Sequence, residues 1–216
     1  KPLQSDENVY NFNSSQRGQI SNAMHIAKSR VQFPRESRPQ NINEFIVDKT
    51  GSILSSIESS NSDNYTIYQS RENDKVTGYA IPIAGKGLWG TMYGYFAIEP
   101  DAETVKGITF YRHKETPGLG AEISLGWFQE PFIGKTIFDG KEFKSITVVK
   151  GGAKEDDMHG VDGISGGTIT SDGVSDMLDE RLSKYLPFFN QKLSEMIEAD
   201  TVVVDSLQAL TLNTIK

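Results

Sequence analysis

A glycine- and hydroxyl-rich turn near the end of the chain contains the residues best suited to chemistry. It reads VDGISGGTITSDGVSDML from Val161 to Leu178 and leads into a pattern typical of an amphipathic helix. Glycines before a helix let backbone N–H groups converge, and the helix terminus adds partial positive charge, so the turn is suited to a phosphate or another anion. The alternative is a simple helix cap, with Thr170 or Ser171 as the N-cap residue.

The helix terminus alone is too weak to hold an anion. It contributes about 0.3 to 2 kcal/mol, whereas micromolar binding requires about 8 kcal/mol. A phosphate ligand at this turn therefore needs either an aromatic and apolar pocket or a covalent bond to one of the hydroxyls.

A hydrolytic site is another interpretation of the same turn. The segment GISGG, residues 163–167, fits the nucleophile-elbow pattern G-x-S-x-G with Ser165 as the nucleophile. In α/β-hydrolases the histidine follows the serine in the chain, whereas His25, His113 and His159 all precede Ser165. The chain order argues against a serine hydrolase, which stays open as an alternative.

Other nucleotide-binding and metal-binding patterns fail on their context. GKGLWG, residues 85–90, fits the dinucleotide pattern G-x-G-x-x-G, but the following TMYGYFAIEP predicts a strand where a helix is required. GKT, residues 134–136, lacks the first glycine of a P-loop. The histidines have no metal-ligand spacing, KEDDMHG lacks an EF-hand pattern, and cysteine is absent. We therefore predict no metal site.

The composition excludes further classes of protein. The 216 residues carry a formal net charge of −7 with scattered lysines and arginines, which argues against nucleic acid as a partner. No stretch approaches the roughly 20 apolar residues of a membrane span, and no signal peptide is recognisable. A hydrophobic content of 37% with 24% charged residues is ordinary for a soluble globular domain.

The hydrophobic pattern indicates the elements that must position the turn. NYTIYQS and TGYAIPIAG, joined by ENDKV, predict a β-hairpin, and LWGTMYGYFAIEP and TVKGITFYRHKET predict two more strands. Ile123, Trp127 and Phe128 recur at helical spacing within AEISLGWFQEPFIGK, and FKSITVVKG predicts a further strand. From Ser171 onward the apolar positions share one helical face.

This order of elements predicts one α+β domain with a mostly antiparallel sheet packed by helices. We expect an N-terminal segment at residues 1–40, in which ISNAMHIAKSRVQF forms a helix or wraps the domain. The main domain then spans residues 41–200. Residues 201–216 form a C-terminal tail that either adds an edge strand or packs against the domain.

Several stretches of the chain resemble FMN-binding domains. DGISGGT, Asp162 to Thr168, is similar to the flavinylation motif D-x-x-[ST]-G-A-[TS], in which the final threonine carries FMN through a phosphoester bond. GKGLWGTMYGYFAIEPD, ETPGLGAEI and VVKGGA resemble, in order and spacing, the C subunit of the sodium-translocating NADH:quinone reductase, over about residues 75 to 190. The G subunit of the Rnf electron-transport complex is a close relative, and GKGLW favours the former.

The resemblance implies a set of cofactor-binding residues. Thr168 would carry FMN covalently, and Thr170 is the fallback acceptor. Glu115 would fix the ETPGLG loop. Trp89 would lie near the isoalloxazine ring, although both Trp89 and Leu119 also suit a hydrophobic core. The remaining members of the set are Thr116, Leu119 and Gly120 along the ring face and Asp162, Ser165, Gly166 and Gly167 in the turn, with Gly167 where the family has alanine.

The resemblance implies an electron carrier within a sodium-pumping membrane complex. FMN would pass electrons between redox centres of a path from NADH to quinone, and the subunit itself would bind neither NADH nor quinone. Its implied partners are the other subunits of the complex and a flavin transferase during maturation. The family has a Lys-Pro sequence like the initial KPLQ after an N-terminal membrane helix, which implies a single-pass anchor in the bacterial inner membrane and a periplasmic domain. A cofactor-free binding module at a membrane surface is the remaining alternative.

Overall fold

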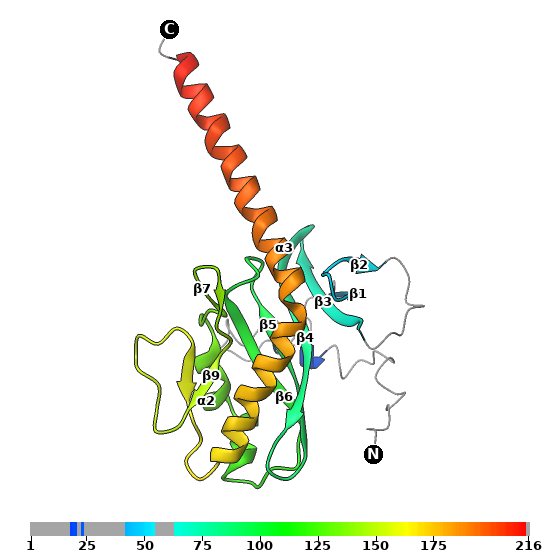
Figure 1. Ribbon diagram of the computed structural model, residues 1–216, viewed down its shortest axis with the longest axis vertical. Helices are drawn as coiled ribbons and strands as arrows, with labels where there is room; N and C mark the ends of the chain where they lie inside the picture. Colours follow the sequence, from blue (N-terminus) through cyan, green and yellow to red (C-terminus); the bar gives the residue numbers. More distant parts are fainter. Residues whose placement is uncertain (1–17, 21–22, 24–41, 55–62, 215–216) are drawn as a thin grey trace.

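A six-stranded antiparallel sheet forms the centre of the protein (Figure 1). The computed structural model describes residues 18–20, 23, 42–54 and 63–214, with side chains described as far as residue 198. The strands of the sheet are β1 (Ile42–Val47), β2 (Ile53–Leu54), β3 (Tyr65–Glu72), β4 (Lys75–Lys86), β5 (Thr91–Ile98) and β6 (Val105–Arg112), and they lie in the order β2-β1-β3-β4-β5-β6. The prediction of a mostly antiparallel sheet in an α+β domain is confirmed.

The predicted hairpin is formed by β3 and β4. Its turn residues Asn73 and Asp74 have φ angles of 49° and 62°. Two consecutive left-handed residues form the tight turn whose twist matches that of the flanking strands, and Asn and Asp tolerate this conformation best after glycine. The local sequence therefore sets the register next to the turn, where Glu72 pairs with Lys75 and Arg71 with Val76, and the register shifts further along, between Ser70 and Arg71.

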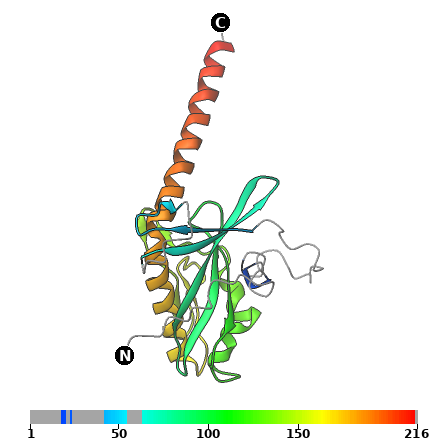
Figure 2. The same cartoon turned by 90° about the vertical axis from the view of Figure 1, so that its right-hand side faces the viewer.

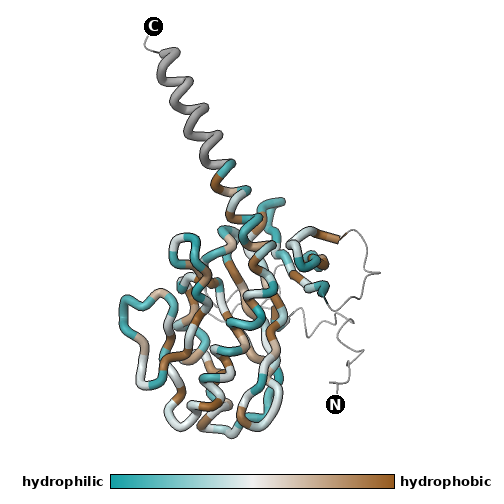
Figure 3. The backbone as a smooth tube through the Cα atoms, viewed as in Figure 1, coloured by the Kyte–Doolittle hydropathy of each residue, from teal (hydrophilic) through white to brown (hydrophobic). Residues whose placement is uncertain are grey.

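The long helix α3 (Thr168–Thr214) packs along one face of the sheet and then extends beyond it (Figures 1 and 2). The core between them contains the inward side chains of the central strands and the apolar face of the helix, including Ile81, Phe96, Val174, Leu178 and Leu182. Hydrophobic residues follow the strands and the part of α3 that crosses the sheet, while the outlying loops are mostly hydrophilic (Figure 3). Burial of this face holds the start of α3 in a fixed position relative to β4.

The opposite face of the sheet carries a smaller hydrophobic cluster. Tyr68, Ala80 and Tyr95 alternate with the core residues along their strands, and they pack with Ile20 and Ala23. Residues 18–20 and 23 are helical. The rest of the predicted N-terminal segment, including most of ISNAMHIAKSRVQF, lies outside the described residues.

Short elements connect the sheet to α3. They are η3 (Gly120–Ser124), α2 (Gly126–Gln129), η4 (Glu130–Phe132), β7 (Phe138–Asp139), β8 (Glu142–Phe143), β9 (Thr147–Val149) and β10 (Gly160–Asp162). β9 and β10 pair in parallel, and β7 and β8 pair antiparallel. The strand predicted at FKSITVVKG is therefore present as the short β9.

The helix predicted from Ile123, Trp127 and Phe128 is broken into three short turns. Leu125 adopts an extended conformation between η3 and α2, and Pro131 lies in the first positions of the next turn, η4. Proline cannot donate the hydrogen bond that would continue a helix. Ile123 and Phe128 are buried as the spacing indicated, but Trp127 is 47% exposed.

The edge strand predicted as one alternative for the C-terminus is wrong for residues 201–214, which continue α3 as a helix. Along the part of the chain that the structure describes, α3 included, no helix combines the length and apolar character required to cross a membrane.

Candidate functional site

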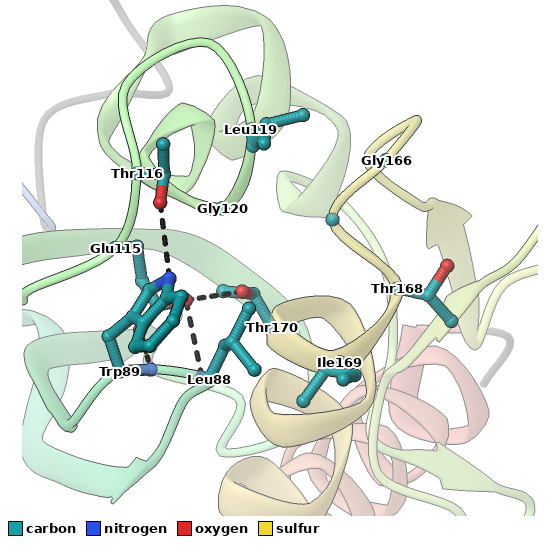
Figure 4. A pocket seen from close by; sticks show the side chains of 11 residues that line it. Leu88, Trp89, Glu115, Thr116, Leu119, Gly120, Gly166, Thr168, Ile169 and Thr170 are labelled. Carbon is teal, nitrogen blue, oxygen red and sulfur yellow. Dashed lines mark hydrogen bonds between the residues drawn. The ribbon is translucent and has the colours of Figure 1, made fainter.

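A cavity of about 220 Å³ lies where the N-terminus of α3 meets two loops of the sheet (Figure 4). The turn between β4 and β5 supplies one wall, the loop after β6 supplies the second, and the turn before α3 supplies the third. The lining residues are Leu88, Trp89, Glu115, Thr116, Leu119, Gly120, Gly166, Gly167, Thr168, Ile169 and Thr170. The fold thus brings together three segments that carry separate motifs in the sequence.

Glu115 ties these three segments together. Its side chain is 5% exposed. The backbone N–H groups of Leu88 and Trp89 donate to its two carboxylate oxygens at 3.2 and 3.0 Å, and the Thr170 hydroxyl donates to Oε2. Every partner is a donor, which suits an ionised carboxylate because that group only accepts hydrogen bonds. Glu115, which was expected to fix its own loop, therefore also contacts the turn after β4 and the first turn of α3.

Two glycines leave the space that this carboxylate occupies. A Cβ on Gly87 would lie 2.6 Å from Oε1 of Glu115, and a Cβ on Gly120 would lie 2.7 Å from Oε2. Neither distance is compatible with van der Waals contact. Glycine at both positions is therefore a steric requirement of the buried carboxylate.

The mouth of the cavity is apolar and open. Trp89 is 64% exposed, and its indole N–H donates to the Thr116 hydroxyl at 3.1 Å, which holds the ring upright beside the cavity (Figure 4). Leu88, Leu119 and Ile169 are exposed around the same mouth. The interpretation of Trp89 and Leu119 as core residues is therefore wrong.

The helix begins earlier than predicted, and its hydroxyls do not cap it as expected. Thr168 is the first residue of α3, and the Ser171 N–H donates to the carbonyl of Gly167 at 2.9 Å, so Gly167 takes the N-cap place. The buried Ser171 hydroxyl instead accepts from the Ile164 N–H at 3.1 Å. Thr170 is directed at Glu115 because the carboxylate offers a stronger acceptor.

The two candidate acceptor threonines differ in access. Thr170 is 1% exposed, and its hydroxyl is engaged by Glu115. Thr168 is only partly buried and lies across the cavity from Trp89 and Thr116 (Figure 4). Gly166, with a φ of 74°, turns the chain just before it. A reaction partner therefore has access to Thr168 without disturbing the hydrogen bonds beneath the cavity.

Two predicted site residues do not line the cavity. Asp162 is exposed and accepts a hydrogen bond from the Ala153 N–H at 2.8 Å, so it braces the preceding loop. Ser165 is exposed at the tip of the turn. The ring nitrogens of His113 and His159 contact Ser124 and the Thr136 carbonyl, and His25 lies outside the described residues. These contacts give no support to a hydrolytic triad at Ser165.

Leu88 and Ile169 line the cavity without having been predicted. Leu88 lies in the turn after β4, and Ile169 lies off the face of α3 that packs on the sheet. An apolar residue at each of these solvent-facing positions was the sequence signal that could have indicated a binding site. Within the described part of the chain, no three acidic or histidine side chains gather as a metal-binding group.

Comparison with known proteins places this geometry in a family. The FMN-binding domain family matches residues 87–183. The C subunit of the Na(+)-translocating NADH-quinone reductase of Vibrio anguillarum is 44% identical over 113 residues, which are 52% of this chain and 44% of that protein. The crystal structure of the C subunit of the same reductase from Parabacteroides distasonis is 34% identical, with a TM-score of 0.69 over 81% of this chain and 91% of that one. The chain belongs to the NqrC family.

A second solved structure of the NqrC family supports the same fold. The Shewanella oneidensis NqrC structure is 27% identical, with a TM-score of 0.71 over 84% of this chain and 100% of that chain. The chain spans about half the length of the curated relatives that it matches. The domain matched at residues 87–183 covers all three walls of the cavity, and the resemblance to the C subunit is confirmed.

Proposed function

We propose that this chain carries electrons as the C subunit of a sodium-translocating NADH:quinone reductase, with FMN bound in the cavity and linked to Thr168 through a phosphoester. The observation that carries the proposal is the position of Thr168. It is the first residue of α3, partly accessible, at the edge of a cavity whose mouth is apolar and aromatic.

The residues around the cavity fit FMN. The first N–H groups of α3 have no partner within the helix and favour a phosphate attached to Thr168. Gly166 and Gly167 add no side chain to the wall of the cavity next to Thr168, and Trp89 and Leu119 offer apolar surface for the isoalloxazine ring. When bound, FMN supplies the reversible uptake and release of electrons.

The size of the cavity supports a tethered ligand. Pockets that enclose a free ligand of this size usually measure about 300 to 1,000 Å³, and this cavity measures about 220 Å³. A flavin here would stay partly exposed, which suits electron exchange with another protein. A covalent bond removes the need for the pocket alone to supply the binding free energy.

Family membership supports a proposal for the partners and the location. The named relatives are subunits of a reductase that transports sodium ions. The proposed partners are therefore the other subunits of that complex, with a flavin transferase during maturation. The proposed location is the periplasmic side of the bacterial inner membrane, with a single N-terminal anchor.

The covalent link can be tested by coexpressing the chain with an active flavin transferase. Denaturing electrophoresis under ultraviolet light should show a fluorescent band for the wild type and for Ser165→Ala, and no band for Thr168→Ala. A wild-type band that survives Thr168→Ala contradicts the assigned linkage. Complete absence of the band from the wild type contradicts covalent attachment itself. Labelling of Ser165 by a fluorophosphonate would favour the hydrolase instead.

A further inference from the structure

Among the described residues, Glu115 is the acidic residue whose side chain is buried. Glu99, Glu142, Glu180 and Glu195 are paired with lysines, but none of the ion pairs that the described residues form includes Glu115. The donors that the described residues offer to its carboxylate are two backbone N–H groups and one hydroxyl. Within the described part of the chain, the carboxylate at the base of the cavity therefore has no cationic side chain in ion-pair contact.

A buried charge acts strongly on its surroundings. The effective dielectric inside a protein is several times lower than that of water, so an interaction between charges is correspondingly larger. The carboxylate also lines the cavity, next to Trp89 and Thr116. A group bound in this cavity therefore experiences the field of Glu115 with less screening than it would from a carboxylate on the open surface.

A flavin that takes up an electron without a proton gains negative charge. A fixed anion nearby disfavours that added charge and lowers the reduction potential, since charges placed around the ring tune the flavin. We propose that Glu115 is a positioning residue that also sets the potential of the flavin, holding it below the value that a neutral residue would give. This inference rests on the proposed function, because it requires FMN in the cavity.

Thr170 allows a second test, because it should change the reduction potential in the opposite direction. Its hydroxyl donates to Glu115, so it offsets part of the carboxylate's charge. Thr170→Val keeps the shape of the side chain and removes this donor, which leaves the negative charge less compensated. Removing the charge and removing its donor should therefore move the potential in opposite directions. A purely structural loosening of the site has no reason to produce opposite shifts.

The test uses the full chain, flavinylated in cells that contain a flavin transferase, with the midpoint potential measured by redox titration against dyes. Glu115→Gln should raise the potential by at least the equivalent of a tenfold change in the ratio of reduced to oxidised flavin, about 30 mV for a two-electron couple. Thr170→Val should lower it. Glu122→Gln is the matched control, because Glu122 accepts from the Trp127 indole at 2.8 Å and does not line the cavity. Its potential should stay close to that of the wild type.

The outcomes separate this inference from the function on which it rests. A wild-type chain that acquires no flavin contradicts both. A flavin-bearing wild type whose potential is unchanged in Glu115→Gln, or is changed equally by Glu122→Gln, overturns the role of Glu115 alone. Should Glu115→Gln fail to fold, Thr170→Val decides, because an unchanged or raised potential in that variant overturns the inference.

Discussion

At the scale of single residues, Gly167 is where this chain departs from the flavinylation motif that it resembles. The motif has alanine at this position. A Cβ on Gly167 would lie 2.8 Å from Cγ2 of Ile164, closer than two carbon atoms approach without strain. Ile164 is 5% exposed and belongs to the main core. The β-branch of Ile164 therefore occupies the space that an alanine methyl group would need.

Gly167→Ala should lower the free energy of unfolding by about 1 to 3 kcal/mol, the usual cost of overpacking. Ile164→Leu has no branch at Cβ, so it should relieve the clash. In a double-mutant cycle measured by urea unfolding, the pair should be more stable than the sum of the two single changes predicts. Additive effects would contradict a direct steric conflict between these side chains.

At the scale of elements, α3 has a packed part and a protruding part. Phe188 is 1% exposed and contacts the rings of Phe45, Tyr79 and Phe189, at centroid distances of 5.8, 5.4 and 5.7 Å. Met196 is two turns further along and 40% exposed. The packed part holds Thr168 and Thr170 at the cavity, because a helix transmits position rigidly along its length.

Phe188→Ala should therefore destabilise the domain by about 3 to 5 kcal/mol, as expected for a large ring removed from a packed core. Met196→Ala should change stability by no more than about 0.5 kcal/mol, because it removes few contacts. Urea unfolding followed by circular dichroism measures both. Equal losses in the two variants would show that the protruding part of α3 is packed in solution.

At the scale of the whole molecule, the sheet separates two different interiors. The face under α3 is mainly aliphatic and rich in phenylalanine, whereas the other face carries tyrosines whose rings contact one another. Tyr95 lies 5.9 Å from the ring of Tyr68 and 5.5 Å from that of Tyr111. Burial raises the pKa of Tyr68 and Tyr95 above the usual value of 10.0. Their hydroxyls resist ionisation in the folded chain.

This burial predicts a loss of stability in alkali. Below about pH 10 the phenols are protonated in both states and contribute no pH dependence. Above it the unfolded chain releases protons that the folded chain retains, so the free energy of unfolding falls, by up to about 1.4 kcal/mol per pH unit for each tyrosine. Urea unfolding between about pH 9 and 11 should show this slope. Tyr95→Phe should reduce it, and an unchanged slope would contradict the assignment.

The sequence by itself determined the local elements and the identity of the chemical segments. Three features depend on residues close together in the chain, so their spacing in the sequence predicts them. They are the alternating strands, the Asn73–Asp74 turn and the apolar face of α3. ETPGLG and the turn before Thr168 were recognisable as motifs for the same reason. Local spacing fails at Leu125, whose extended backbone interrupts the predicted helix between Ile123 and Trp127.

Only the tertiary structure decided how the site is connected. The contact between Glu115 and Thr170 joins residues 55 positions apart, and the contacts of Glu115 with Leu88 and Trp89 join residues 27 and 26 apart. Hydrogen bonds between distant segments leave no periodic pattern, because each partner looks locally like an ordinary loop residue. The sequence also did not predict which apolar residues are exposed. Trp89 and Leu119 are residue types that are usually buried, and they lie exposed at the mouth of the cavity because three segments meet there.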